Sequence, residues 1–196
     1  MWARNPLSGR RLSRRVRSGW NRAGRTARRP RLEPLEERQL LSSVADSGFE
    51  TVQVGSGHYM YNPTGSPWTF AGNSGIAANN SAFTSGNPPA PQGTQVAFLQ
   101  TTGSFTQTVT GWAAGSYVLT FDAAQRGNYQ ASHQDFEVLV DGTVISTFTP
   151  SGTSYLSYST VAFTVTAGSH TITFQGLDSA GGDNTAFVDA VSIAIQ

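Results

Sequence analysis

From residue 46 onward, apolar and polar residues alternate with a period of two. Tyr117, Leu119 and Phe121, for example, alternate with Val118, Thr120 and Asp122. This alternation is typical of strands with one face in a core and one face largely in water. No segment shows a convincing helical period of 3.6. The strands predicted in this way span residues 49–54, 58–61, 68–71, 95–100, 104–110, 116–126, 134–149, 159–166, 169–177 and 185–195.

Turn signals separate these strands at hairpin distances, as at Asp141-Gly142. The pattern therefore predicts an all-β protein folded as an antiparallel β-sandwich. Residues 62–92 are instead rich in Gly, Asn, Ser and Pro, which indicates long surface loops. Such loops are commonly functional. Trp68 and Phe70 lie inside them, either covering the edge of the core or contacting a ligand.

Charge divides the 196 residues into two unlike parts. Residues 1–38 contain twelve arginines and three acids, a net charge of +9, whereas residues 39–196 contain one arginine and nine acids, a net charge of −8. An arginine-rich segment with few aromatic residues buries too little apolar surface to offset the entropy of ordering. We therefore predict a disordered basic segment over 1–45, followed by one β-sandwich domain over 46–196.

The basic segment is interpreted as a secretion leader or sorting segment, although a continuous apolar stretch is missing. A nucleic-acid-binding arm is disfavoured because the acidic body would repel phosphates. An unstructured tail without function is the remaining alternative. The apolar runs are too short for a transmembrane helix, so no membrane insertion is expected.

Residues 32–42 read LEPLEERQLLS and follow the arginine-rich stretch. This string resembles the N-terminal element, of the form LEPLEDRxLLS, of many predicted extracellular proteins of planctomycete bacteria. Only Glu37 departs from it, where Asp is commoner. The resemblance implies that the protein is secreted or lies in the cell envelope.

No catalytic constellation is found in the sequence. The chain has no cysteine and no lysine, so thiolate and Schiff-base chemistry are excluded. The three histidines have no metal-ligand spacing and are interpreted as exposed polar residues. The acid pairs are more simply solvated side chains than a glycosidase dyad. We therefore predict that the protein is not an enzyme. The residues concerned are His58, His133, His170, Asp135 with Glu137, and Asp178 with Asp183.

Three short motifs resemble the galactose-binding-like jelly roll: Gly48-Phe49-Glu50, the strand 117–126, and the closing strand 186–193. The members most similar in layout are xylan- and glucan-binding carbohydrate-binding modules. The resemblance implies a secreted, non-catalytic module that binds a polysaccharide or another glycan. The alternative is a structural or adhesive extracellular unit that binds protein or associates with itself.

The strand phase over 116–126 places Asp122, Ala124 and Arg126 on the solvent face. Arg126 is the body's only arginine, so we expect it to have a specific pairing task, with nearby amide and aromatic groups completing a sugar site. The alternative is that Arg126 pairs with Asp122 or Glu137 on the sheet. The predicted ligand-binding residues are Arg126, Asn128, Tyr129, Gln134 and Trp68.

A structural calcium ion is predicted from the last strand. The strand phase places Asp189 inward with Phe187, Val191 and Ile193, and a buried carboxylate needs a partner. Ca²⁺ binds carboxylate and carbonyl oxygens. In the modules that this chain resembles, the ion lies between acids that correspond to Glu50 and Asp189. The alternative is that Asp189 accepts hydrogen bonds from backbone N–H groups. The oligomeric state is left open.

Overall fold

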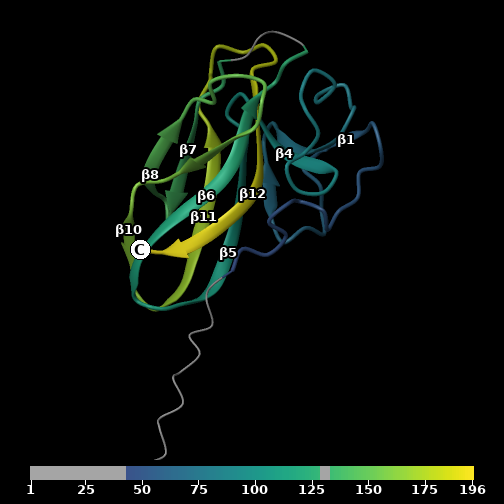
Figure 1. Ribbon diagram of the computed structural model, residues 1–196. Coiled ribbons are helices and arrows are strands. Elements are labelled where there is room, and N and C mark those ends of the chain that lie inside the picture. The colour runs from purple at the N-terminus through teal and green to yellow at the C-terminus, as the bar shows by residue number, and fades with distance from the viewer. Residues whose placement is uncertain (1–42, 129–132) are drawn as a thin grey trace, which may run out of the picture. The chain divides into compact units, whose positions relative to one another are not determined.

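A computed structural model describes residues 43–128 and 133–196 (Figure 1). The predictions about the segment 1–42 and about Tyr129 fall outside these residues. The described residues form strands and loops without a helix. Within the same ranges, nothing could serve as a membrane-spanning helix.

Two antiparallel sheets make up the sandwich, as predicted. The 7-stranded sheet has the order β1 (Tyr59–Tyr61), β3 (Ser74–Ala78), β4 (Gln95–Gln100), β12 (Thr185–Ile195), β6 (Gly115–Gln125) and β10 (Phe163–Val165), and β9 (Leu156–Ser159) also pairs with β6. The 5-stranded sheet has the order β2 (Thr69–Ala71), β5 (Ser104–Trp112), β11 (Gly168–Gly176), β7 (Phe136–Val140) and β8 (Thr143–Phe148).

Aromatic side chains dominate the core between the sheets. The inward residues of β6 are those that the alternation predicted, and Phe121 lies 5.1 Å from Phe174, centroid to centroid. Trp68 is only 1% exposed and packs against Phe49 and Phe105. Its indole Nε1 donates to the Asp46 carbonyl. Trp68 is therefore a core residue, and its prediction as a ligand-contacting residue is wrong because its ring offers no face to solvent.

A second apolar cluster covers part of the outer face of the 7-stranded sheet. It consists of Ala77, Phe83, Val96, Phe98 and Phe187. Phe83 comes from the connection between β3 and β4, which lies over the sheet. The expected solvent exposure of Ala124 and Arg126 is therefore wrong: these two residues are 0% and 5% exposed.

Three local features depart from the sequence expectations. Residues 49–54 form bends and irregular backbone instead of a strand, and the Asp46 carboxylate accepts hydrogen bonds from the N–H groups of Glu50 and Thr51. Strand β3 lies within the stretch that was expected to be loops. A bulge in β12 between Asp189 and Ser192 shifts the strand's phase, with Ala190 at a φ of 52°.

The bulge changes which residues of β12 face the main core. Ala186 and Val188 before it, and Val191 after it, pack in the main core, whereas Phe187 packs in the outer cluster. Asp189 is 0% exposed. It is buried as expected, but it shares the phase of Phe187 and so lies toward the outer side of the sheet.

The expectation that His170 is exposed is wrong, because the residue is buried, with only 8% of its surface exposed. Its ring lies between two turns: Nδ1 is 2.6 Å from the Asp141 carboxylate, and Nε2 is 2.9 Å from the Thr166 carbonyl. The hydrogen bond with Asp141 raises the pKa of His170 and lowers the pKa of Asp141. Since both partners are acceptors, the protonated ring satisfies both contacts at once.

Candidate functional site

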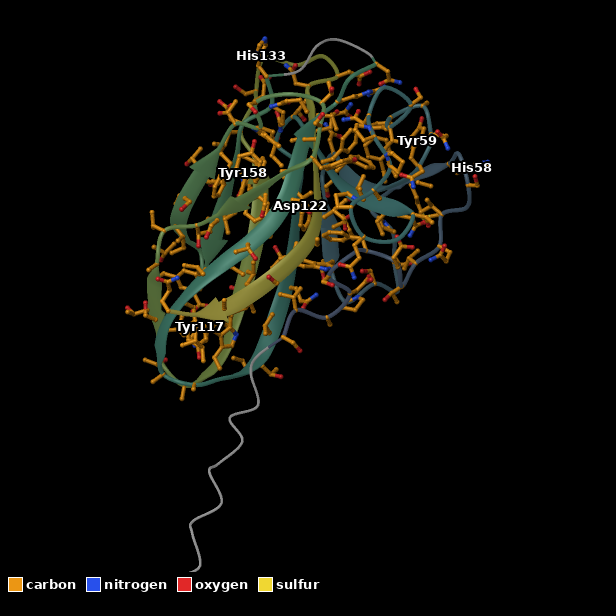
Figure 2. The ribbon with its side chains drawn as sticks, in the orientation of Figure 1. His58, Tyr59, Tyr117, Asp122, His133 and Tyr158 are labelled. Carbon is orange, nitrogen blue, oxygen red and sulfur yellow. The ribbon has the colours of Figure 1, made fainter. Side chains whose placement is uncertain are left out.

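The edge strand β1 carries two partly exposed tyrosines on the outer face of the 7-stranded sheet. Tyr59 and Tyr61 are 43% and 39% exposed. The register pairs Tyr61 with Gly75, and Gly75 with Phe98, so these residues share one face. Figure 2 shows Tyr59 beside His58 on this side of the described body.

Gly75 allows the tyrosine to approach the sheet. A Cβ atom at this position would lie 2.8 Å from Phe98 Cζ and would also clash with the Met60 carbonyl. With no side chain there, the rings of Tyr61 and Phe98 meet edge to face at 5.0 Å. This arrangement is favourable for aromatic pairs.

Phe83 packs against both Tyr59 and Phe98. Its ring lies 4.5 Å from Tyr59 and 4.7 Å from Phe98. A compact turn holds it in place: the Ser81 and Thr84 hydroxyls lie 3.0 Å apart, and Thr84 Oγ1 donates to the Ala78 carbonyl. The turn is therefore fixed by local polar contacts, and Phe83 is presented at a defined position.

Arg126 lies beneath this turn. Its guanidinium carbon is 4.3 Å from the centre of the Phe83 ring, a cation–π contact. Its Nη2 donates to the Ala82 carbonyl and its Nε donates to Asn128 Oδ1. Asn128 in turn donates to the Ala82 carbonyl and to Ser85 Oγ. Arg126 and Asn128 thus tie the end of β6 to the β3–β4 connection.

A polar network joins the tyrosines to the loop before β12. The Tyr61 hydroxyl donates to Gln100 Oε1 at 2.6 Å, and Gln100 Nε2 donates to Asp183 Oδ1 at 2.5 Å. The other oxygen of Asp183 is 3.5 Å from Arg126 Nη1. Burial raises the pKa of Tyr61, and the negative charge of Asp183 raises it further. We call Tyr59, Tyr61, Gln100 and Asp183 the tyrosine surface.

The structure engages the described members of the predicted ligand set in contacts within the protein. Arg126 and Asn128 lie beside the tyrosine surface but act as supports. Gln134 is 0% exposed and exchanges hydrogen bonds with Gln125, so it also holds the fold. The residues that sequence reasoning missed are Tyr59, Tyr61, Phe83, Gln100 and Asp183. The sequence Tyr59-Met60-Tyr61 in the predicted strand 58–61 was the available signal. It places two aromatic residues on one face of a short strand.

Glu50 and Asp189 both contact the connection before β4. Asp189 Oδ2 accepts from the Gln92 N–H, and Oδ1 accepts from the Ala190 N–H. Glu50 Oε1 accepts from the N–H groups of Thr94 and Gln95. Backbone donors thus satisfy both carboxylates in part, which is the alternative stated for Asp189.

The backbone N–H groups carry no formal charge, so they do not neutralise the carboxylate of the buried Asp189. Burial raises the pKa of Asp189 to about 7, and the charges of Glu50 and Asp122 add to this effect. The buried Tyr155 hydroxyl, which Asp189 influences electrostatically, has no hydrogen-bond partner within the described residues. Two carboxylates with oxygen lone pairs to spare fit a hard cation. No cluster of three or more His, Cys, Asp or Glu side chains suited to a metal occurs in residues 43–128 and 133–196.

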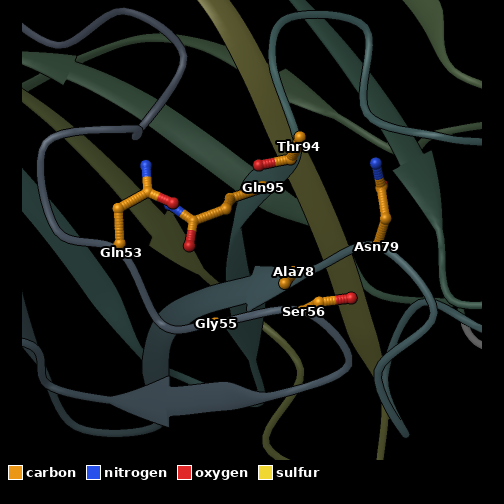
Figure 3. Close-up of a pocket in the computed structure, with 7 residues that line it drawn as sticks. All are labelled: Gln53, Gly55, Ser56, Ala78, Asn79, Thr94 and Gln95. Carbon is orange, nitrogen blue, oxygen red and sulfur yellow. The ribbon is translucent and has the colours of Figure 1, made fainter.

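A hollow of about 290 Å³ lies between the turn before β1, the end of β3 and the start of β4 (Figure 3). Gln95 contributes to its lining, but its amide is engaged: Oε1 accepts from the Val54 N–H, and Nε2 donates to the carbonyls of Phe49 and Val52. Gln53 Nε2 donates to Glu50. The amides that line this hollow therefore hold Glu50 and the backbone around it in place.

Comparison with solved structures places the fold among jelly-roll proteins. The Stig cyclase Fisc from Fischerella sp. TAU, in complex with an indole derivative, matches with a TM-score of 0.58 and 20% identity, covering 79% of this chain and 97% of the cyclase. The carbohydrate-binding module TmCBM61, in complex with β-1,4-galactotriose, matches with a TM-score of 0.54 and 17% identity, covering 79% of this chain and 99% of the module. The chain has their jelly-roll fold.

At these identities the likeness concerns the fold alone. The same architecture carries catalysis in the cyclases and sugar binding in the module, so the fold does not decide between the two. Neither protein-family models nor curated proteins give a match to the chain.

Proposed function

We propose that this chain is a secreted or cell-envelope, non-catalytic module that binds a polysaccharide or another glycan at the tyrosine surface. One observation carries the proposal: two partly exposed tyrosines lie on one sheet face and are joined through Gln100 to a carboxylate. The sugar-binding module of the same fold supports it.

The chemistry of the surface suits a sugar. Aromatic side chains offer apolar surface to the C–H faces of sugar rings, and polar side chains at their edge exchange hydrogen bonds with hydroxyls. Because the Tyr61 hydroxyl donates its proton to Gln100, its oxygen accepts from a ligand hydroxyl. The Asp183 side chain is 35% exposed and also accepts hydrogen bonds. The Gln100 bridge fixes the spacing of these two acceptors.

Affinity electrophoresis tests this proposal with the full chain and a panel of soluble polysaccharides that includes β-1,4-galactan. We expect at least one glycan to retard the wild type, Tyr61→Ala to abolish the retardation, and Leu156→Ala to retain it. Leu156 is the matched control because it is 50% exposed on β9. Equal retardation of all three proteins, or none on any glycan, would overturn the proposal. Binding of indole compounds in place of sugars would instead favour a role like that of the cyclases.

We also propose that Glu50 and Asp189 hold a structural Ca²⁺. The bound ion would compensate the charge of the Asp189 carboxylate, whose pKa burial raises to about 7. A chelator should lower the melting temperature of the wild type and leave that of Asp189→Ala almost unchanged. If the wild type melts at the same temperature with and without chelator, the backbone N–H groups suffice and the calcium proposal is wrong.

A further inference from the structure

The charged groups around the tyrosine surface differ in how far they reach solvent. Arg126 is 5% exposed, because the Phe83 ring covers its guanidinium and the Ala82 carbonyl accepts from it. Its positive charge is therefore directed into the protein. The Asp183 side chain, by contrast, is 35% exposed. The Asp183 carboxylate, which also faces Arg126 Nη1 at 3.5 Å, is thus the charged group of the tyrosine surface that reaches solvent.

The loop that carries Asp183 adds a second acid. Asp178 lies in the same connection between β11 and β12 and is fixed there by the Ala180 N–H and by the Asn184 amide. The negative charge of Asp183 also reaches the hydroxyl of Tyr61, whose pKa it raises after the larger effect of burial. Arg126 lowers that pKa by a smaller effect, so the Asp183 carboxylate dominates the charge that acts on the Tyr61 hydroxyl.

The surrounding body has the same sign of charge. Residues 43–128 and 133–196 contain nine acids and one arginine, and that arginine is the buried Arg126. A net charge of this sign attracts cations and repels anions during the approach of a ligand. The net charge of the described body and the charge of Asp183 therefore have the same sign.

We propose that the tyrosine surface selects glycans built of amino sugars with free ammonium groups, accepts neutral sugars more weakly, and rejects uronic acids. This inference rests on the proposed function. An ammonium group gains a charge-assisted hydrogen bond to Asp183 and a cation–π contact with the tyrosine rings. A uronate carboxylate would lie against Asp183, where like charges repel.

Isothermal titration at pH 6 tests the inference with three probes: a glucosamine hexamer, the fully N-acetylated hexamer of the same linkage, and a galacturonate hexamer. The first two differ only in the charge and acetylation of the amine. The full chain also carries its arginine-rich segment, which attracts acidic polymers. Binding at the tyrosine surface is therefore defined as the part that Tyr61→Ala removes.

We expect the Tyr61-dependent affinity for the glucosamine hexamer to exceed that for the acetylated hexamer about tenfold, with no Tyr61-dependent binding of galacturonate. Asp183→Asn should reduce this preference to about twofold. Glu137→Gln removes the same charge from β7 in the other sheet and should retain the preference.

The outcomes separate the two proposals. Tyr61-dependent binding in which the acetylated or acidic hexamer equals or exceeds the glucosamine hexamer overturns the charge selection and leaves glycan binding standing. A preference that survives in Asp183→Asn also overturns it. If neither these hexamers nor the neutral polysaccharide panel binds in a Tyr61-dependent manner, both proposals fail.

Discussion

Replacing Phe83 by alanine tests the way in which the tyrosine surface is supported. The side chain is 5% exposed and packs on Tyr59 and Phe98 at 4.5 and 4.7 Å. It also lies 4.3 Å from the guanidinium carbon of Arg126. The substitution removes these three contacts together and uncovers a buried cation.

The cost follows from burial. Phenylalanine-to-alanine changes in cores destabilise proteins by about 3–5 kcal/mol. Phe83 lies in the connection between β3 and β4 and not in a central strand, so this segment can relax locally, and we expect the lower end, about 3 kcal/mol. Phe83→Leu keeps most of the apolar volume and should cost less than about 1.5 kcal/mol.

Urea unfolding of the full chain, followed by tryptophan fluorescence, measures both variants. A loss of about 3 kcal/mol corresponds to a melting temperature lower by roughly 6–12 °C for a domain of this size. A change for Phe83→Ala within about 0.5 kcal/mol of zero, the range of ordinary surface substitutions, would refute the reasoning. So would a Phe83→Leu variant as unstable as Phe83→Ala.

Two further predictions concern the other end of the sandwich and the start of the described body. His170→Gln should lower the melting temperature more at pH 5 than at pH 9, because a raised folded-state pKa stabilises the fold below the unfolded value of 6.5 and the gain is lost as pH rises through the folded pKa. The half-exposed Asp141 limits this to about 1 kcal/mol. Equal losses at both pH values would contradict it. A fragment that begins at Ser43 and one that begins at Asp46 should both melt cooperatively. The shorter fragment should be about 1–2 kcal/mol less stable, because it lacks Ala45, which exchanges two hydrogen bonds with Gln107. A non-cooperative transition of either fragment would show that the body does not fold alone.

The period of two was sufficient to predict the sandwich, because most inward side chains of the half-buried strands are apolar. The limits of β4 and β12 agree with the sequence expectation to the residue. The bulge in β12 could not be predicted, since Ala190 adopts a φ of 52° without the glycine that usually indicates such a conformation. The phase before the bulge was therefore misassigned for Phe187 and Asp189, whereas Val191 and Ile193 after it face the main core as expected.

The tyrosine surface was harder to predict because its residues come from three separate segments. Gln100, Asp183 and the tyrosines meet only through sheet pairing, which local pattern does not specify. The outer cluster was hidden for a related reason: alternation assigns one face to water and cannot show that a loop covers it. Arg126 contacts the Ala82 carbonyl, Asn128 and Asp183. None of these partners can be read from the alternation.

Backbone-amide shift mapping tests the central claim most directly, because it locates the ligand on the molecule. The glucosamine hexamer is titrated into the ¹⁵N-labelled full chain, and the amides whose resonances move are placed on the fold. We predict that they belong to β1, to residues 82–86 and to residues 178–184. Shifts confined to the 5-stranded sheet, or no saturable shifts in the described body, would contradict the account.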